Sequence, residues 1–409
     1  MVADTGARAG AESPARALPP PGSVPWLLVA AALIAGPTLL AALTGQPALT
    51  AIPVGFLLGF VLEKGDLCGA SAMSEVLLFR DRRKLFGLWI AIVASMVVFA
   101  ALDLLGLARP NPKPLTWLSM SLGGFIFGIG TVLGGGCVSG CLMKAGRGSL
   151  NSMAALAGIP IGVGLVEAGP LAPLNRAMRG SVLSRIDGGP ITFHSLVGMP
   201  FWVVALLAAA VTATAVVRHR RSTGAAGAPV RPGLRRPWRP WVAGLAVGLL
   251  GGAGWLSSAA VGRNYPLGVT HGPYHAAVIA LSGAPQPGWS VGPSIPATCS
   301  PEDALRMDVA FRPETVWWLV ALAGSLVAGS FVSAGLSGRA RLLPRPPGET
   351  VIAFLGGIVI GMGAGLASGC VIGNIVSGLG LASAGAAVFA GTMFLGNRIA
   401  TRLYLMGGR

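Results

Sequence analysis

Long apolar runs separated by short basic loops constrain this chain more than any other feature. Each run has about the 17 to 25 residues that an α-helix needs to cross a bilayer. The runs cover residues 26–45, 85–107, 115–135, 149–169, 196–217, 241–262, 315–335, 351–368 and 380–396. Only 11% of the residues are charged and 53% are apolar, whereas soluble domains are about 25% charged. The sequence therefore predicts an all-α polytopic membrane protein bound to the lipid bilayer.

One further apolar segment, 48–79, is interrupted by Glu63, Lys64 and Asp66, and Cys68 follows directly. Charges at membrane depth are tolerated where they are buried in protein or line a cavity, so we expect a broken helix that faces the interior. The alternative is that these charges cap a short loop at the surface. A short apolar stretch, 275–283, cannot cross a bilayer and is expected to be re-entrant or interfacial.

The placement of basic residues predicts the orientation. The formal net charge of +16 comes mostly from arginines in short loops, at 80–84, 144–147, 218–239 and 339–345. Basic loops stay on the cytoplasmic side, which makes both termini cytoplasmic and puts the acidic segments outside. No basic domain exists that could hold a duplex, so nucleic-acid binding is not expected.

Residues 123–158 and 356–391 form an internal repeat with a spacing of 233 positions. The two copies align without a gap and share a Gly-Cys step that places Cys137 opposite Cys370. The other matched pairs are Gly123/Gly356, Gly124/Gly357, Gly128/Gly361, Gly130/Gly363, Leu133/Leu366, Gly136/Gly369, Val138/Val371 and Gly140/Gly373. Because five cysteines occur in 409 residues, this match indicates a true repeat that sets two thiols in equivalent positions.

The first copy runs toward a basic loop and the second runs away from one, which predicts two inverted-topology repeats that meet at a central path. The expected organisation is a disordered cytoplasmic tail at 1–23, a first membrane repeat at 24–217, a basic cytoplasmic linker at 218–239, a second membrane repeat at 240–397 and a tail at 398–409.

The small residues before each cysteine predict a helix break. Glycines at spacings of two and four are typical of close helix packing, which is the simpler interpretation of each one alone. Three adjacent small residues weaken a helix, however, so we expect half-helices that begin near Cys137 and Cys370. The free backbone N–H groups at such a start favour an anion.

Thiols beside these breaks suit a soft, sulfur-bearing anion better than a hard one. A buried cysteine alone is usually an apolar filler, but matched positions favour a role for Cys137 and Cys370. No Cys-x-x-Cys pair occurs and the histidines are scattered, so neither a metal nor a cofactor is expected. No acid or base other than Lys144 and Arg147 lies near these cysteines, so no catalytic residue is expected and the chain is not expected to be an enzyme.

Four motifs resemble those of the YeeE/YedE family of bacterial membrane proteins. They are GFLLGFVLEKGDLCGA around Cys68, GGGCVSGC around Cys137, GWLSSAAVGRNYPLGVT from Gly254 and GMGAGLASGCVIGN around Cys370. The resemblance covers residues 26–396 and implies thiosulfate uptake across the inner membrane through an hourglass-shaped protein. It also implies a central path lined by Cys68, Cys137 and Cys370.

Six further residues are expected to support the path: Gly135, Gly136, Cys141, Arg263, Gly369 and Asn374. Arg263 either contacts lipid headgroups or gathers anions at the outer mouth together with His271 and His275. Cys299 fits no motif of the family.

Three alternatives to a thiosulfate transporter stay open at this point. A membrane sulfurtransferase would carry a persulfide on Cys137 or Cys370. Some members of the family are linked to selenium, so a selenium compound is a second alternative. A scaffold subunit for a soluble sulfur-carrier protein would use the basic cytoplasmic loops, and a transporter could hand its substrate to the same partner.

Overall fold

The structure is a computed structural model, and it describes residues 23–185, 189–222, 236–285, 313–342 and 346–407. The predicted N-terminal tail and most of the basic linker lie outside these ranges, as does Cys299. Nearly all described elements are helices, and the two strands are a two-residue pair, β1 (Leu115–Thr116) against β2 (Val182–Leu183). The predicted all-α class is therefore confirmed.

The helices of the first half follow the predicted runs closely. They are α1 (Ser23–Thr44), α2 (Ala51–Gly65), α3 (Gly69–Phe79), α4 (Arg83–Leu104), α5 (Trp117–Leu133), α6 (Val138–Arg147), α7 (Leu150–Glu167), α8 (Ala172–Arg179), α9 (Phe193–Val197) and α10 (Phe201–Ser222). A short 3-10 turn, η1 (Pro47–Thr50), joins α1 to α2. Since α10 continues to Ser222, the first residues of the predicted linker are helical.

The second half is described at residues 236–285, 313–342 and 346–407. Its elements are α11 (Pro240–Ala260), α12 (His271–Ser282), α14 (Pro313–Leu336), α15 (Pro347–Leu366), η3 (Val371–Gly378), α16 (Ala384–Ala400) and η4 (Thr401–Leu405). The last two η elements are wound as π-helices. Among the described residues, nine helical segments are long and apolar enough to cross a membrane, which supports the polytopic prediction.

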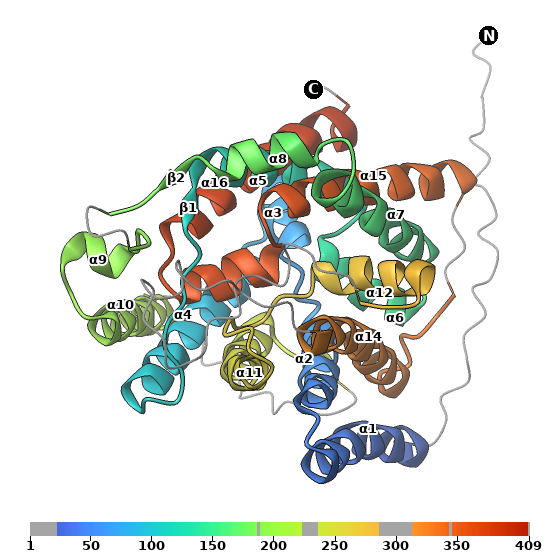
Figure 1. Cartoon of the computed structure of the whole chain (residues 1–409), viewed down its shortest axis with the longest axis horizontal. Helices are drawn as coiled ribbons and strands as arrows, with labels where there is room; N and C mark the ends of the chain where they lie inside the picture. Colours follow the sequence, from blue (N-terminus) through green and yellow to red (C-terminus); the bar gives the residue numbers. More distant parts are fainter. Residues whose placement is uncertain (1–22, 186–188, 223–235, 286–312, 343–345, 408–409) are drawn as a thin grey trace.

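The helices form one body (Figure 1). The main contacts between a helix of the first half and one of the second half are each matched by a contact between the corresponding helices with the halves exchanged. Helix α2 packs against α14 while α11 packs against α4, and α7 packs against α15 while α16 packs against α5. Helices α2 and α11 also contact each other, as do α5 and α15. Such exchanged pairings are what two related units produce about an axis between them. Their opposite orientation in a membrane stays a prediction.

Close packing of the repeats depends on matched glycines. A Cβ atom added at Gly128 of α5 would collide with the Met393 carbonyl oxygen of α16. One added at the equivalent Gly361 of α15 would collide with the Ile159 carbonyl oxygen of α7. Small residues of this kind let helix backbones approach closely, so the helix-packing interpretation holds for these glycines.

Peripheral elements lie at two edges of the body. Helix α1 packs on α2 and α14 at the lower edge of the view, whereas α9 and α10 lie at its left edge, with α10 against α4 (Figure 1). Helix α12 begins earlier than the predicted segment, at His271, and packs against α7 and α14. Its 12 residues are too few to cross a bilayer, as expected.

Candidate functional site

Cys68 and Cys137 immediately precede two half-helices, and their sulfur atoms are in contact. Cys68 precedes α3 and Cys137 precedes α6, each with an extended backbone. The two Sγ atoms are 3.7 Å apart, and either thiol can be the donor. A Cβ atom added at Gly140 would collide with the Cys68 sulfur, so this glycine leaves the space that the thiol occupies. The predicted half-helix start at Cys137 is confirmed.

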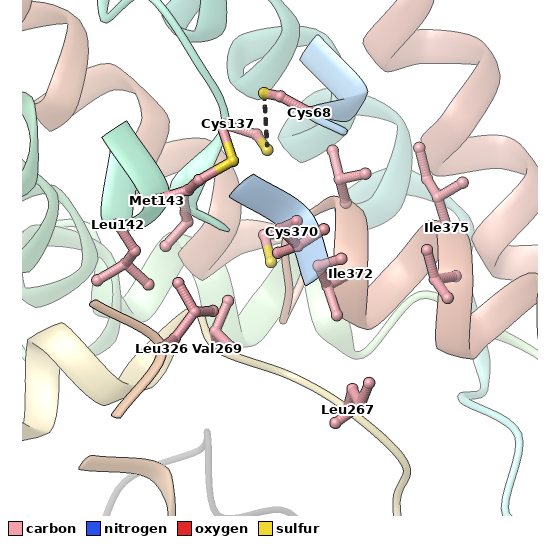
Figure 2. Close-up of a cluster of buried hydrophobic side chains, with 14 of the residues drawn as sticks. Cys68, Cys137, Leu142, Met143, Leu267, Val269, Leu326, Cys370, Ile372 and Ile375 are labelled. Atoms are coloured by element: carbon pink, nitrogen blue, oxygen red, sulfur yellow. Dashed lines mark hydrogen bonds between the residues drawn. The ribbon is translucent and has the colours of Figure 1, made fainter. Parts of the chain in front are cut away.

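Cys370 holds the equivalent position in the second half. It precedes η3 with an extended backbone and is fully buried. It belongs to the same buried apolar cluster as Cys68 and Cys137, and Figure 2 shows the three sulfur atoms among side chains such as Leu142 and Ile372. The structure thus brings together the three thiols that the sequence singled out. Their role in a substrate path is a separate question.

The two helix breaks before Cys137 and Cys370 share one backbone device. Gly135 has a φ of +70° and Ser368, which aligns with it, has a φ of +52°. Each carbonyl oxygen accepts a hydrogen bond from a lysine: Lys144 Nζ lies 2.6 Å from Gly135 O, and Lys113 Nζ lies 2.5 Å from Ser368 O. Left-handed residues end a helix, so each break is closed by a left-handed residue and a cation.

Beside Cys370 lies a group of residues that we call the Cys370 mouth: Lys113, Arg263, Tyr265 and Asn374. Lys113 Nζ is 2.8 Å from Asn374 Oδ1 and 5.1 Å from the centre of the Tyr265 ring. The Arg263 guanidinium lies 5.4 Å from the Tyr265 ring and donates to the carbonyl oxygens of Tyr265 and Pro266. The Tyr265 hydroxyl donates to Gly373 O at 2.6 Å, which ties this loop to η3.

The Cys370 mouth carries positive charge that no carboxylate of the described residues neutralises. Within the part of the chain that the structure describes, neither Lys113 nor Arg263 forms an ion pair. Burial, together with the nearby charge of Arg263, lowers the pKa of Lys113 to about 7. Two such cations beside a helix start favour an anion.

The opposite arrangement surrounds the break before Cys68, where we define a Cys68 network of Glu63, Asp66, Lys84, Arg147 and Arg339. Arg147 Nη2 is 2.9 Å from Glu63 Oε2 and 3.2 Å from Asp66 Oδ1. Lys84 Nζ is 2.5 Å from Asp66 Oδ2, and Arg339 Nη2 is 3.7 Å from Glu63 Oε1. Glu63 is fully buried, so the interior interpretation of this break holds for it. Asp66, with a side chain that is 40% exposed, lies nearer the surface.

The remaining predicted residues lie close to the thiols in different ways. Gly136 adjoins Cys141, whose thiol donates back to Gly134 O at 3.8 Å. Gly369 has no room for a side chain, because a Cβ atom there would lie 2.9 Å from both Lys113 Nζ and Asn374 Oδ1. His271 does not join Arg263, since it pairs with Glu167 at 2.9 Å.

Sequence reasoning missed Lys113. It lies between Pro112 and Pro114, in the connection from α4 to α5. Prolines on both sides hold a chain extended, and a single lysine displayed in that way between two apolar runs was the available signal. Among the described residues, no group of three or more His, Cys, Asp or Glu side chains could hold a metal ion.

Comparison with known proteins fits this geometry. A family model described as sulphur transport matches residues 64–399. The chain is 29% identical over 346 residues to the thiosulfate transporter TsuA of Spirochaeta thermophila, which covers 81% of this chain and 91% of that relative. It is 27% identical over 339 residues to the thiosulfate transporter TsuA of Escherichia coli strain K12, covering 80% of this chain and 86% of that relative. The chain belongs to the sulphur transport family, YeeE/YedE, as its motifs predicted.

Proposed function

We propose that this protein takes up thiosulfate, or a closely related sulfur compound, along a path lined by Cys68, Cys137 and Cys370. The observation that carries the proposal is the placement of three thiols from three helix breaks in one buried cluster, beside cations that lack a counter-ion at one end. The two relatives named thiosulfate transporter support the choice of substrate.

The chemistry of the thiols suits this substrate. Thiosulfate carries a soft terminal sulfur and three sulfonate oxygens, and a neutral thiol is a polarizable, weak donor and acceptor that can contact either end. The apolar side chains around the three thiols exclude water from them. Because weak contacts of similar kind follow one another, the ion can move between them without a strong site that traps it.

Direction follows from the charge on the two sides. We place the Cys370 mouth on the outer face, where Lys113 and Arg263 capture the anion, and the Cys68 network on the cytoplasmic face. The positive-inside placement of the 80–84 and 144–147 loops supports this orientation, with the two repeats crossing the bacterial inner membrane in opposite directions and both termini inside. A soluble sulfur-carrier protein could then accept the substrate at the basic cytoplasmic loops.

Orientation can be tested separately from transport. A reporter enzyme fused after Arg236, in the linker between the halves, should be active only in the cytoplasm. Labelling of a cysteine introduced in that linker by a membrane-impermeant reagent added outside intact cells would contradict both the orientation and the inverted repeat.

Uptake of labelled thiosulfate into proteoliposomes tests the function. Purified wild-type protein should concentrate the label, and a hundredfold excess of unlabelled thiosulfate should block uptake far more than the same excess of sulfate, because sulfate lacks the soft sulfur. Equal block by sulfate would contradict the assigned selectivity. Preferential block by a selenium analogue would shift the substrate toward selenium.

A membrane sulfurtransferase is the second candidate, because a thiol in contact with another thiol can accept a sulfane sulfur. It would require an activated thiolate and a base. Among the described residues, no carboxylate or histidine hydrogen-bonds to any of the three thiols; Cys68 and Cys137 contact each other, and Cys137 also contacts the Ser139 hydroxyl. The geometry therefore favours passage of the intact ion.

A further inference from the structure

A buried cluster of ionisable side chains lies outside the thiol path, where α7, α8 and α12 meet (Figure 1). Glu167, the last residue of α7, has a side chain that is only 3% exposed. Its Oε1 atom lies 2.9 Å from Nε2 of His271 on α12 and 3.8 Å from Nη2 of Arg179 on α8. His275, one turn further along α12, is also buried.

One oxygen of this carboxylate is unused. Among the described residues, Glu167 Oε2 is buried and has no hydrogen-bond partner. A buried acceptor without a partner is costly, and ionisable residues inside membrane proteins are rare and typically serve ion or proton pathways. A proton on the imidazole of His271 would make its contact with Glu167 Oε1 a charge-assisted hydrogen bond.

The cluster is linked to the Cys370 mouth through Arg179. The Arg179 guanidinium donates to the carbonyl oxygen of Gly365, in the last turn of α15. Ser368 follows two residues after the end of α15, and its carbonyl oxygen accepts a hydrogen bond from Lys113. Arg179 also lies close enough to Lys113 for their charges to interact. A change of charge at Glu167 is therefore transmitted to the groups that would capture the anion.

Charged and titratable side chains lie on most of the elements that surround Glu167 and His271. Helix α8 contributes Arg176 and Arg179, α12 contributes His271, Tyr274 and His275, and the α4–α5 connection contributes Lys113. Helices α14 and α15, which pack against α12 and α7, contain only Glu314 and Glu349, each in the first turn. Helix α6 contributes Lys144 and Arg147 at the other end of α7, and α5 contributes none. Within the described ranges of the chain, Glu167 is thus the only carboxylate in the cluster.

We propose that Glu167 and His271 form a proton-binding site that couples proton uptake to uptake of the sulfur anion. The inference rests on the proposed function and adds its energy source. A proton from outside binds to the pair and makes the cluster more positive by one charge, which raises occupancy of the anion at the Cys370 mouth. By linkage the bound anion raises the affinity of the pair for the proton.

Proton and anion then move inward together. Thiosulfate carries two negative charges, so one accompanying proton halves the charge that must move against an inside-negative potential. No bond to sulfur forms or breaks, and no electron is transferred. The ionised Glu167 that remains after proton release repels a second anion until it binds another proton, which prevents uptake of the anion alone.

The test measures proton movement directly in proteoliposomes that contain a trapped pH indicator. Membrane potential is clamped at zero with valinomycin and equal potassium, and outer pH is held constant so that titration of Lys113 does not change. On addition of thiosulfate, the lumen of wild-type vesicles should acidify at a rate proportional to uptake. An alkaline lumen should drive accumulation of labelled thiosulfate.

Glu167→Gln should abolish the acidification and lower gradient-driven uptake by about tenfold or more. Exchange of outer for luminal thiosulfate, which needs no net proton movement, should fall much less. His271→Gln should weaken the coupling in the same direction. Glu349→Gln is the matched control, because this carboxylate lies at the opposite end of α15, and it should acidify the lumen as the wild type does.

Two results would overturn the inference: accumulation of thiosulfate by the wild type without luminal acidification, or acidification by Glu167→Gln at the wild-type rate per ion. The first needs no variant and so does not depend on how the variants fold. If the wild type moves no thiosulfate under any gradient, the proposed function itself fails. That outcome is distinct from transport without protons.

Discussion

The two lysines that close the helix breaks have equivalent partners but opposite surroundings. Lys144 binds the carbonyl oxygen of Gly135 and lies near Asp66 of the Cys68 network, where carboxylates pair with cations. Lys113 binds the carbonyl oxygen of Ser368 and lies near Arg263, and neither forms an ion pair among the described residues. The backbone is nearly symmetric and the charge is not.

In the proposed mechanism, the repeat positions the thiols, and the difference in charge sets the direction of transport. The matched breaks place Cys137 and Cys370 in equivalent positions, which gives a path that could work in either direction. Cations without a paired carboxylate among the described residues raise the local concentration of an anion at one end, while cations that are paired with carboxylates at the other end retain it less. In the proposed mechanism, this asymmetric charge on a nearly symmetric backbone gives transport its direction.

Removing either matched thiol should have the largest effect on transport. We expect Cys137→Ala and Cys370→Ala each to abolish thiosulfate uptake, because each removes one contact from a series that has no parallel route. Growth of a transport-deficient host on thiosulfate measures the loss. Cys141→Ala is the control, since this thiol faces the Gly134 carbonyl oxygen, and it should retain most uptake. Wild-type growth of either matched variant would contradict a thiol path.

Breaking the Cys68 network should chiefly reduce stability. Arg147→Met leaves the fully buried Glu63 with only the longer Arg339 contact, and loss of one partner of a buried ion pair costs on the order of 3 kcal/mol. Thermal unfolding in detergent measures this. Arg83→Met is the matched control, because Arg83 is 85% exposed and its pairing with Asp81 contributes less than about 1 kcal/mol. Equal unfolding temperatures for the two variants would exclude a structural role for the network.

Replacing Lys113 or Lys144 by methionine, one at a time, tests whether the charges at the two helix breaks differ in their effect on anion capture. A hydrogen bond to a charged group contributes about 1.5–3 kcal/mol, so Lys113→Met should raise the half-saturating thiosulfate concentration by about 10- to 100-fold. Lys144→Met should change it by less than about threefold, because nearby carboxylates already offset that charge. Initial uptake rates over a range of thiosulfate concentrations give the half-saturating concentration of each variant. A larger effect of Lys144→Met would reverse the assigned direction.

The pKa of Lys113, lowered to about 7, predicts a pH dependence of capture. Below pH 7 the ammonium is charged and attracts the anion, and above pH 7 it loses its proton and the attraction with it. The half-saturating concentration should therefore rise as the outer pH increases from about 6 to 8, by about tenfold at most. Lys113→Met should show a flatter profile. A profile in Lys113→Met as steep as in the wild type would assign the dependence to another group.

Arg263 should give the smallest effect, since Lys113 remains beside it. We expect Arg263→Gln to slow uptake by about threefold at low thiosulfate and hardly at all at saturation, as loss of electrostatic capture does. Uptake at two concentrations, one far below and one far above half-saturation, measures this. Unchanged uptake at the low concentration would favour contact with lipid headgroups.

Much of the fold followed from the sequence because a bilayer leaves few choices. Apolar runs had to be helices, and the breaks at Asp66, Gly135 and Ser368 followed from charges and small residues within them. The thiol cluster was also predictable in part, because a repeat that matches Cys137 with Cys370 implies equivalent places. Contact between Cys68 and Cys137 required the structure, since no local pattern relates their two breaks.

Pairings over long distances in the chain could not be read from local patterns. Lys113 lies 255 positions before Ser368, and Glu167 lies 104 positions before His271. Each of these groups seen alone resembles an ordinary charge at a helix end. Only the packing of α7 against α12, and of the α4–α5 connection against the Cys370 break, shows that they act on the same site.

The central claim, passage of intact thiosulfate between neutral thiols, is tested most directly by thiosulfate labelled differently on its two sulfur atoms. Purified protein in liposomes would receive the ion outside, and both labels would be followed into the lumen while mass spectrometry monitors the cysteines. We expect both labels to arrive in equal amounts and Cys137 and Cys370 to stay unmodified. Sulfite released outside, together with one added sulfur on either cysteine, would contradict this account and establish a sulfurtransferase.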